Sequence, residues 1–397
     1  MSQSNLILNP YLTLKFFRNE QQQYVASFSA PTPGSGLQIL ESKRADDAEL
    51  YDLFFELQQT SLNFLDVEAD LSDAQRDLLC QRGVLIESDK IPQPPLFACF
   101  LDEITINKGN SLIAASDLIV NPTLFYDEAQ DYQSVMRRRR CGFEPGSPIV
   151  WIRDAKTEIT FPYWLRGDFL EIVKNLKPGE KPPASLTSAQ IAVLLQARIL
   201  LLSCDAAANK SDEFNRAIEH FQNQKYAELR QILPAVQLAA MRRYFADLRA
   251  QGFMRFNDRQ VELRHAVHND ALAIYFHEQL APLVSRLVGE SVKPSYVYSA
   301  TYVEDAVLKP HLDRPQCEFT MSMQIGYSPE QPDDVSPWAL CLNDSDNNRI
   351  ETYLANGDAL VYKGCELVHY RDRLFKNHES TSVFFHFVNK DFDGALE

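Results

Sequence analysis

The chain has 397 residues, which exceeds one ordinary domain and predicts two or three at about 100–200 residues each. Hydrophobic residues make up 45% and charged residues 23%, a balance that excludes a disordered or fibrous protein. The net charge of −15 argues against nucleic-acid binding, because the phosphate backbone would be repelled.

The sequence contains no apolar run long enough for a membrane span, so we expect none. The first residues lack a basic segment followed by an apolar stretch, and no signal peptide is expected. The seven cysteines are scattered without a CxxC pair, which is typical of reduced thiols. Together these features predict a cytoplasmic protein.

Two stretches of the front half are similar to each other at an offset of 115 residues. Each begins with an N-capping residue, Ser72 or Thr187, and continues into an amphipathic helix and a short apolar strand. Six positions are identical between residues 71–88 and 186–203: Leu71/Leu186, Ala74/Ala189, Gln75/Gln190, Leu79/Leu194, Gln81/Gln196 and Leu85/Leu200. We interpret the stretches as an internal repeat; the alternative is two unrelated amphipathic helices.

A strand-like piece and a helical piece precede each stretch. They lie at Tyr11–Phe17 and Ala48–Leu62 in the first copy, and at Ile149–Ile152 and Phe169–Leu176 in the second. The order helix, helix, strand is the skeleton of a winged-helix-like unit. We therefore predict one such unit at residues 1–110 and a second at residues 111–205.

Four consecutive arginines, Arg137–Arg140, lie between the two repeated stretches. A basic run in an acidic chain either holds an acidic partner or forms an ordinary solvated loop, and both interpretations stay open.

After about residue 205 the pattern changes to two amphipathic helices followed by short strands. The helices are expected at Leu233–Gln251 and Ala271–Val288. The strands are expected at Pro294–Val303, Cys317–Tyr327, Trp338–Leu342, Ile350–Leu354, Ala359–Tyr362, Glu366–Tyr370 and Thr381–Val388. This order predicts helices packed on an antiparallel jelly roll at residues 206–397, and an α+β class for the whole chain.

The second of these strands alternates in polarity. Thr320, Ser322 and Gln324 fall on one face, and they either line an interior pocket or face solvent.

A candidate metal site begins at His311-Leu312-Asp313, where two metal-competent side chains at i and i+2 point to the same side of a strand. His369, 56 residues after Asp313, is the natural third ligand. Two histidines and one carboxylate leave coordination positions open for a bidentate cosubstrate and O₂.

A second match to this spacing occurs at His268-Asn269-Asp270. We expect no strand to lead into it, and Asn269 or Asp270 is better explained as a helix N-cap. The other histidines, including His386, are interpreted as ordinary core or surface residues.

From about residue 230 onward the chain resembles the Fe(II)/2-oxoglutarate-dependent oxygenases, in layout the prolyl 4-hydroxylase-like branch. The matching residues are Tyr302-(x)8-His311-Leu-Asp313, Gly357-Asp358-Ala-Leu-Val-Tyr, His369 and Ser380-Thr-Ser-Val-Phe-Phe-His-Phe. The resemblance covers rather under half of the chain. It implies a double-stranded β-helix, a distorted jelly roll, with helices buttressing one sheet.

The resemblance also implies roles for individual residues. His311, Asp313 and His369 would bind Fe(II), and Tyr302 would contact the tail of 2-oxoglutarate. The family usually has an arginine or lysine where this chain has His378, Glu379 and Ser380.

The carboxylate of 2-oxoglutarate that lies far from the metal needs a buried cation or several hydrogen-bond donors. His378 and Ser380 together resemble the family's Arg-x-Ser with histidine in place of arginine. Arg371, two residues after His369, could reach this carboxylate instead, and His378 and Arg371 stay equally open as its partner. Lys376 and Arg373 are further options.

The implied reaction is a hydroxylation, since members that halogenate replace the acidic ligand and Asp313 is present here. O₂ is the oxidant, and 2-oxoglutarate is converted to succinate and CO₂. Two alternatives are a non-catalytic jelly-roll binding module and a cupin-type metalloenzyme that uses no 2-oxoglutarate.

The first winged-helix-like unit weakly resembles the precursor-peptide recognition domains of ribosomally made peptide pathways. In such modules a peptide adds a strand to a sheet edge. The resemblance implies a peptide, protein or amino-acid-like substrate. The alternative is that the front half is a scaffold or a dimer interface, which leaves a homodimer open.

Overall fold

The computed structural model describes the following residues: 6–9, 11–19, 21–32, 36–48, 50–52, 55, 72–104, 115–127, 143–144, 146–203, 211–258, 260–344 and 346–396. The predicted helix Ala48–Leu62 lies largely outside them, and Arg137–Arg140 lie entirely outside. The chain forms two compact units, Met1–Pro95 with Phe245–Arg255, and Leu96–Tyr244 with Phe256–Glu397.

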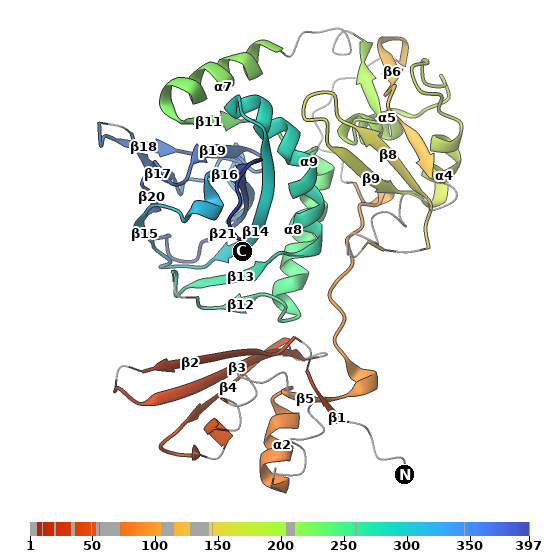
Figure 1. Cartoon of the computed structure of the whole chain (residues 1–397). Coiled ribbons are helices and arrows are strands. Elements are labelled where there is room, and N and C mark those ends of the chain that lie inside the picture. The colour runs from red at the N-terminus through yellow and green to blue at the C-terminus, as the bar shows by residue number, and fades with distance from the viewer. Residues whose placement is uncertain are drawn as a thin grey trace. The chain divides into compact units, whose positions relative to one another are not determined.

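The first unit is built on a three-stranded antiparallel sheet in the order β2-β3-β4 (Figure 1). A separate strand pair, β1 with β5, and the helix α2 also belong to it. The bounds are β1 Leu6–Leu8, β2 Thr13–Arg18, β3 Tyr24–Thr32, β4 Gly36–Lys43, α2 Asp73–Gln81 and β5 Leu85–Glu87. Phe28, Leu79 and Leu85 are among the buried residues that join the sheet, helix and strand in one core.

Residues 115–203 of the second unit repeat this arrangement. Strand β6 pairs with β10, and β7, β8 and β9 form a three-stranded antiparallel sheet. The bounds are β6 Leu118–Val120, β7 Phe125–Asp127, β8 Ile149–Arg153, β9 Thr160–Trp164, α4 Gly167–Lys174, α5 Ser188–Gln196 and β10 Leu200–Leu202.

The predicted N-caps of the repeat are confirmed. The side chains of Ser72 and Thr187 each accept a hydrogen bond from the backbone N–H three residues on. In return, the side chains of Gln75 and Gln190 accept a hydrogen bond from the backbone N–H of the capping residue, which completes a capping box.

The repeat also extends to a turn that the sequence comparison missed. The side-chain amide of Asn9 donates to the carbonyl of Gly83, and that of Asn121 donates to the carbonyl of Arg198, each over 2.9 Å. Gly83 and Arg198 both have a positive φ, at 65° and 56°. The same asparagine-to-turn hydrogen bond therefore occurs in both copies of the repeat.

From residue 211 onward, the described residues form two antiparallel sheets and three α-helices, and the end of α8 from Phe245 is counted with the first unit. The larger sheet has the order β11-β19-β16-β21-β14-β13-β12 and the smaller has the order β15-β20-β17-β18 (Figure 1). The helices are α7 Ser211–Gln224, α8 Ala235–Ala250 and α9 Ala271–Val288. The strands are β11 Tyr226–Leu229, β12 Arg255–Phe256, β13 Arg264–His268, β14 Val292–Tyr302, β15 Leu308–His311, β16 Phe319–Ser328, β17 Leu340–Asn343, β18 Arg349–Thr352, β19 Ala359–Lys363, β20 His369–Arg371 and β21 Glu379–Asn389.

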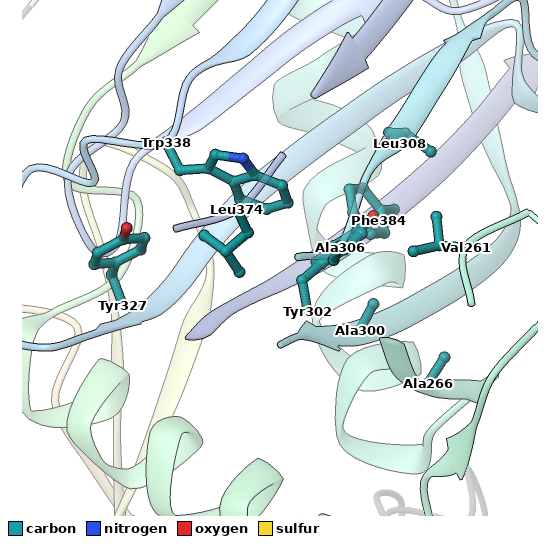
Figure 2. Packing of buried hydrophobic residues seen from close by; sticks show 10 residues of the cluster. All are labelled: Val261, Ala266, Ala300, Tyr302, Ala306, Leu308, Tyr327, Trp338, Leu374 and Phe384. Carbon is teal, nitrogen blue, oxygen red and sulfur yellow. The ribbon is translucent and has the colours of Figure 1, made fainter. Parts of the chain in front are cut away.

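The two sheets face each other, because side chains from both meet in shared clusters. Leu340 and Leu342 of the smaller sheet pack with Leu360 and Tyr362 of the larger one. A second apolar cluster surrounds Tyr302 and Trp338 (Figure 2). The helices and antiparallel sheets of this region were predicted, and the sandwich places the inner faces of both sheets around one interior.

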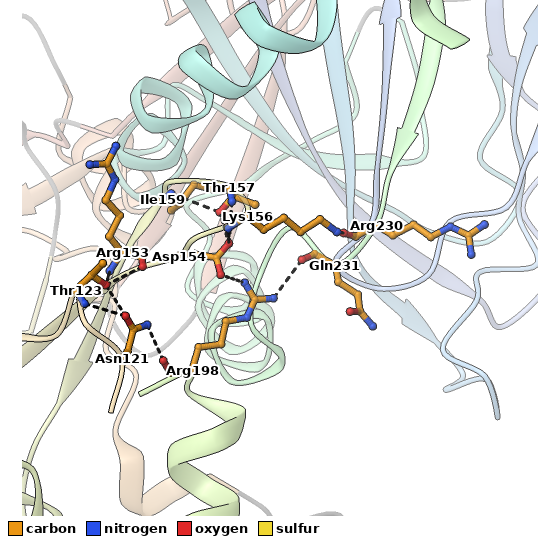
Figure 3. A network of polar contacts seen from close by, with 10 residues as sticks. All are labelled: Asn121, Thr123, Arg153, Asp154, Lys156, Thr157, Ile159, Arg198, Arg230 and Gln231. Atoms are coloured by element: carbon orange, nitrogen blue, oxygen red, sulfur yellow. Dashed lines mark hydrogen bonds and ion pairs between the residues drawn. The ribbon is translucent and has the colours of Figure 1, made fainter. Parts of the chain in front are cut away.

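Polar contacts join the second repeat to the sandwich within the second unit (Figure 3). Asp154 Oδ1 pairs with Arg198 Nη1 at 2.6 Å, and Arg198 Nη2 donates to the carbonyl of Gln231 at 3.3 Å. Lys156 Nζ donates to the carbonyl of Arg230 at 2.7 Å. Asp154 is buried, so its pairing with Arg198 satisfies a carboxylate that would otherwise be costly.

No helix among the described residues is long and apolar enough to cross a membrane.

Candidate metal centre

Three metal-competent side chains meet at the smaller sheet. His311 ends β15 and lies directly opposite His369 in the β15–β20 ladder, with ring centroids 4.2 Å apart. Asp313 follows two residues after His311, and its Oδ1 lies 3.7 Å from Nε2 of His311 and 3.5 Å from Nε2 of His369. The three ligand atoms all lie within 4.8 Å of one another, which suits a single metal ion.

Both histidines direct Nε2 toward the place where the three ligand atoms meet. Nδ1 of His311 lies 2.8 Å from the carbonyl of Lys309, and Nδ1 of His369 lies 3.0 Å from the carbonyl of Leu367. A carbonyl can only accept, so each Nδ1 carries the proton and each Nε2 offers a lone pair. Fixing the tautomer in this way is the usual preparation of a histidine for metal binding.

Asp313 is held by groups from the larger sheet. The Thr320 hydroxyl donates to Asp313 Oδ2 at 2.9 Å, and Nδ1 of His386 lies 2.9 Å from the same hydroxyl. The Thr320 hydroxyl has one proton and donates it to Asp313. Nδ1 of His386 therefore donates its own proton to the Thr320 oxygen. These two hydrogen bonds hold Asp313 through Oδ2, so that Oδ1 faces the two histidines.

The charge states also suit a divalent cation. Burial and the neighbouring His369 lower the pKa of His311, which favours the neutral, metal-binding form. Burial raises the pKa of Asp313, but the contacts with His369 and Thr320 outweigh it and lower the pKa overall. Burial lowers the pKa of His386 to about 4, so this histidine is neutral where it supports Thr320.

An exposed residue also contacts the site. The side-chain amide of Gln260 lies 2.8 Å from Nε2 of His311. Metal binding needs the lone pair of that nitrogen, so the amide has to turn away when His311 binds a metal.

A buried cation lies further along β20. Arg371 is 2% exposed, its Nη1 donates to the carbonyl of Trp338 at 2.9 Å, and its guanidinium carbon lies 4.6 Å from the Trp338 ring centroid. Its Nε and Nη2 have no hydrogen-bond partner among the described residues. These two nitrogens share one edge of the guanidinium, the edge that holds a carboxylate through two parallel bonds. Burial lowers the pKa of Arg371, yet arginine stays charged, so a bound anion would compensate this buried charge.

The other residues predicted to bind the cosubstrate lie in neighbouring strands. Ser380 on β21 is paired with Tyr302 on one side and with Tyr327 on the other. Tyr302 is fully buried, and its hydroxyl accepts a bond from Arg264 Nη1 at 2.9 Å, which leaves its own proton for another acceptor. The half-buried His378 lies with Nδ1 2.6 Å from the Tyr327 hydroxyl.

Sequence reasoning missed several of these groups. Gln260, Tyr327 and Trp338 gave no signal, because their roles come from tertiary proximity, and His386 was interpreted as ordinary. Thr320, Ser322 and Gln324 were left open, and all three are buried on the inward face of β16. The expectation that no strand leads into His268 is wrong, because β13 ends at this residue, whereas the predicted N-cap at Asp270 is confirmed.

No family model and no curated protein matches the chain. Among solved structures it is similar to a Pseudomonas putida prolyl-4-hydroxylase, at 16% identity over 45% of this chain and 99% of that one, with a TM-score of 0.37. It is also similar to HygX from Streptomyces hygroscopicus, solved with nickel, 2-oxoglutarate and hygromycin B bound, at 11% identity, 45% and 88% coverage and a TM-score of 0.36. A 2OG-Fe(II) oxygenase family oxidoreductase from Burkholderia pseudomallei matches at 14% identity, 48% and 95% coverage and a TM-score of 0.38. Because identity is this low, we argue the function from the side chains of the site.

Proposed function

We propose that the chain is an Fe(II)- and 2-oxoglutarate-dependent oxygenase. The observation that carries the proposal is a pairing of two features in one interior. Three neutral or anionic ligand atoms converge at His311, Asp313 and His369. Two residues further along the same strand lies the buried Arg371, whose carboxylate-binding edge has no partner in the part of the chain that the structure describes. The first feature suits a metal ion, and the second suits a dicarboxylate that reaches the metal with its other end.

The residues divide the work as follows. His311, Asp313 and His369 would hold the iron, which supplies the activation of O₂ when it is bound together with 2-oxoglutarate. Arg371 would bind the far carboxylate of 2-oxoglutarate through Nε and Nη2. Tyr302 would donate its free hydroxyl proton to the cosubstrate.

His378 takes a different role in this proposal. Its ring contacts the Tyr327 hydroxyl, so it would orient Tyr327 rather than replace the missing family arginine. The buried walls around Tyr302 and Trp338 would exclude water from the cosubstrate (Figure 2).

The test is an anaerobic titration of the metal-free protein with Fe(II) and then 2-oxoglutarate, followed by absorption spectroscopy. We expect a weak visible charge-transfer band that needs both additions and is lost in Asp313→Ala, because the triad then lacks its carboxylate. Succinate should be released slowly when air is admitted.

Other outcomes would favour the alternatives. Iron binding with neither the band nor succinate would favour a cupin-type metalloenzyme. No iron binding at all would leave a jelly-roll binding module.

We further propose a peptide, protein or amino-acid-like substrate that is hydroxylated. The reason is the repeated front half, whose small sheets suit strand addition by an extended chain.

A further inference from the structure

A second group of metal-competent side chains adjoins the candidate metal centre. One ligand atom each of Asp313, Cys317 and His386 lies within 4.8 Å of the other two. Cys317 and His386 are both buried, with 1% and 7% of their surfaces exposed. The group shares only Asp313 with the first site, which is formed by His311, Asp313 and His369. It therefore offers a different set of donor atoms beside the same carboxylate.

The backbone places these three side chains next to one another. After Asp313 the chain forms a short 3₁₀ helix, Pro315–Cys317, in which the Cys317 N–H donates to the carbonyl of Arg314 at 2.8 Å. His386 lies on β21, directly opposite Thr320 of β16. The Thr320 hydroxyl contacts both Asp313 and His386 over 2.9 Å, which fixes the imidazole relative to the carboxylate. The ligands are thus held by a turn and by paired strands.

The surroundings of Cys317 suit a metal-bound thiolate. The Tyr296 hydroxyl lies 2.9 Å from Sγ and can donate to it, as outer partners of metal ligands do. Burial, and after it the charge of Asp313, raises the pKa of Cys317 to about 12, so the metal-free thiol keeps its proton. A cation bound between the two residues offsets both causes, and the thiol proton is released as the metal–sulfur bond forms.

The donor set indicates which kind of ion would bind. With Asp313 ionised, Cys317 as thiolate and His386 neutral, the ligands carry two negative charges, which one divalent cation balances in this buried place. A thiolate is a soft ligand, and together with an imidazole and a carboxylate it is typical of Zn²⁺. The first site has no sulfur ligand, and its two histidines and one carboxylate suit Fe(II).

We propose that Asp313, Cys317 and His386 form a second metal site, which binds a thiophilic divalent cation such as Zn²⁺ in competition with the metal of the first site. The competition follows from the shared carboxylate. Two divalent cations at adjacent sites would set four positive charges against the two negative charges of these ligands, and the surplus would be buried. Inhibition of an oxygenase by the second ion rests on the proposed function, whereas binding of that ion does not.

The test uses Cd²⁺ as the probe, because its bond to a thiolate gives an ultraviolet charge-transfer band. The metal-free full-length chain is titrated with Cd²⁺ and followed by absorption spectroscopy. Cys317→Ser keeps a hydroxyl for the contact with Tyr296 but offers no thiolate. We expect this variant to lose the band that forms at the first equivalent, and to bind Cd²⁺ at least about tenfold more weakly, because a ligand is lost.

A matched control is Cys341→Ser. Cys341 is also 1% exposed, and it belongs to no metal-competent group among the residues that the structure describes. Cys341→Ser should therefore give the wild-type band, which shows that removing a buried thiol does not by itself abolish binding.

A further variant separates the two sites. His369→Ala removes a ligand of the first site only, so the Cd²⁺ band should persist in it. Fe(II) added anaerobically to the Cd²⁺-loaded protein should weaken the band in wild type and leave it unchanged in His369→Ala, because only wild type can bind iron together with Asp313 at the first site.

The proposal is overturned if Cys317→Ser shows the wild-type band, since Cd²⁺ is then bound by another cysteine. Loss of the band in His369→Ala would also overturn it, because the ion would then depend on the first site. A wild type that binds Fe(II) while its Cd²⁺ band stays unchanged would contradict the competition. A chain that binds no Fe(II) contradicts the proposed function, yet its Cd²⁺ band still decides on the second site, so the two proposals fail separately.

Discussion

A Cβ atom on Gly364 would lie 2.4 Å from Oδ2 of Asp313, closer than packed atoms can approach. The two residues are also joined through the backbone, since the Asp313 N–H donates to the carbonyl of Gly364 at 2.9 Å. The absence of a side chain at position 364 is therefore what allows the carboxylate its place between the two histidines.

We expect Gly364→Ala to displace Asp313 and to weaken Fe(II) binding by at least about tenfold, as loss of ligand orientation does. Anaerobic calorimetric titration with Fe(II) measures this. Gly326→Ala is the control, because its new methyl group meets only the flexible side chain of Arg242 at 3.1 Å. Unchanged affinity in Gly364→Ala would show that Asp313 does not depend on this approach.

The Thr320 hydroxyl is expected to tune the metal site without touching the metal. Thr320→Val leaves Asp313 Oδ2 without its donor and His386 without its acceptor, and we expect Fe(II) affinity to fall about 10- to 100-fold. Ser322→Ala is the matched control, since Ser322 lies on the same buried face and its hydroxyl has no partner among the described residues. Equal affinities for the two variants would argue against a supporting role for Thr320.

The choice between Arg371 and His378 can be settled by cosubstrate affinity. Arg371→Gln should lose about 2 to 5 kcal/mol of 2-oxoglutarate binding, a weakening of at least about 30-fold, because a buried carboxylate loses its charged partner. His378→Gln should weaken binding much less, since it removes only the contact to Tyr327. The dissociation constant of 2-oxoglutarate for the Fe(II) protein measures both, and Fe(II) affinity should stay unchanged. The reverse order of effects would make His378 the principal partner.

His277 is expected to control acid stability. It is buried on α9, its Nε2 lies 2.7 Å from the carbonyl of His386, and burial lowers its pKa from 6.5 to about 3. Neutral His277 therefore contributes to the free energy of unfolding in full above about pH 6.5. This contribution is lost as the pH falls toward 3, because the unfolded chain binds the proton more readily than the folded one.

His277→Gln keeps a donor for the His386 carbonyl but does not titrate. From neutral pH down to about pH 5, wild type should lose about 2 kcal/mol more of its free energy of unfolding than this variant. Urea unfolding across this range measures the difference. Burial also lowers the pKa of His386, but His386 titrates in both proteins, so its effect cancels. His220→Gln, at an exposed position, should follow wild type.

Local features were predicted well from the sequence. The N-caps at Ser72, Thr187 and Asp270 depend only on a short polar side chain and the backbone three residues on. The two long helices and most strands of the sandwich follow from apolar periodicity, although β20 is shorter than expected at His369–Arg371. Strands β11, β12, β13 and β15 were missed, because two to five residues are too few for a clear alternation. The helix α7, Ser211–Gln224, was also missed, since only two helices were expected after residue 205.

The sequence by itself determined the residue types of the candidate metal site, the spacing of His311 and Asp313, and the repeated pattern of the front half. Only the tertiary structure decided which side chains meet. The β15–β20 ladder sets His369 opposite His311, and the fold of the larger sheet brings Thr320 and His386 to Asp313. One edge of Arg371 is left without a partner among the residues that the structure describes. The division has a physical reason: caps and periodicity act over a few neighbouring residues, whereas these contacts join strands far apart in the chain, whose register depends on the packing of the whole sandwich.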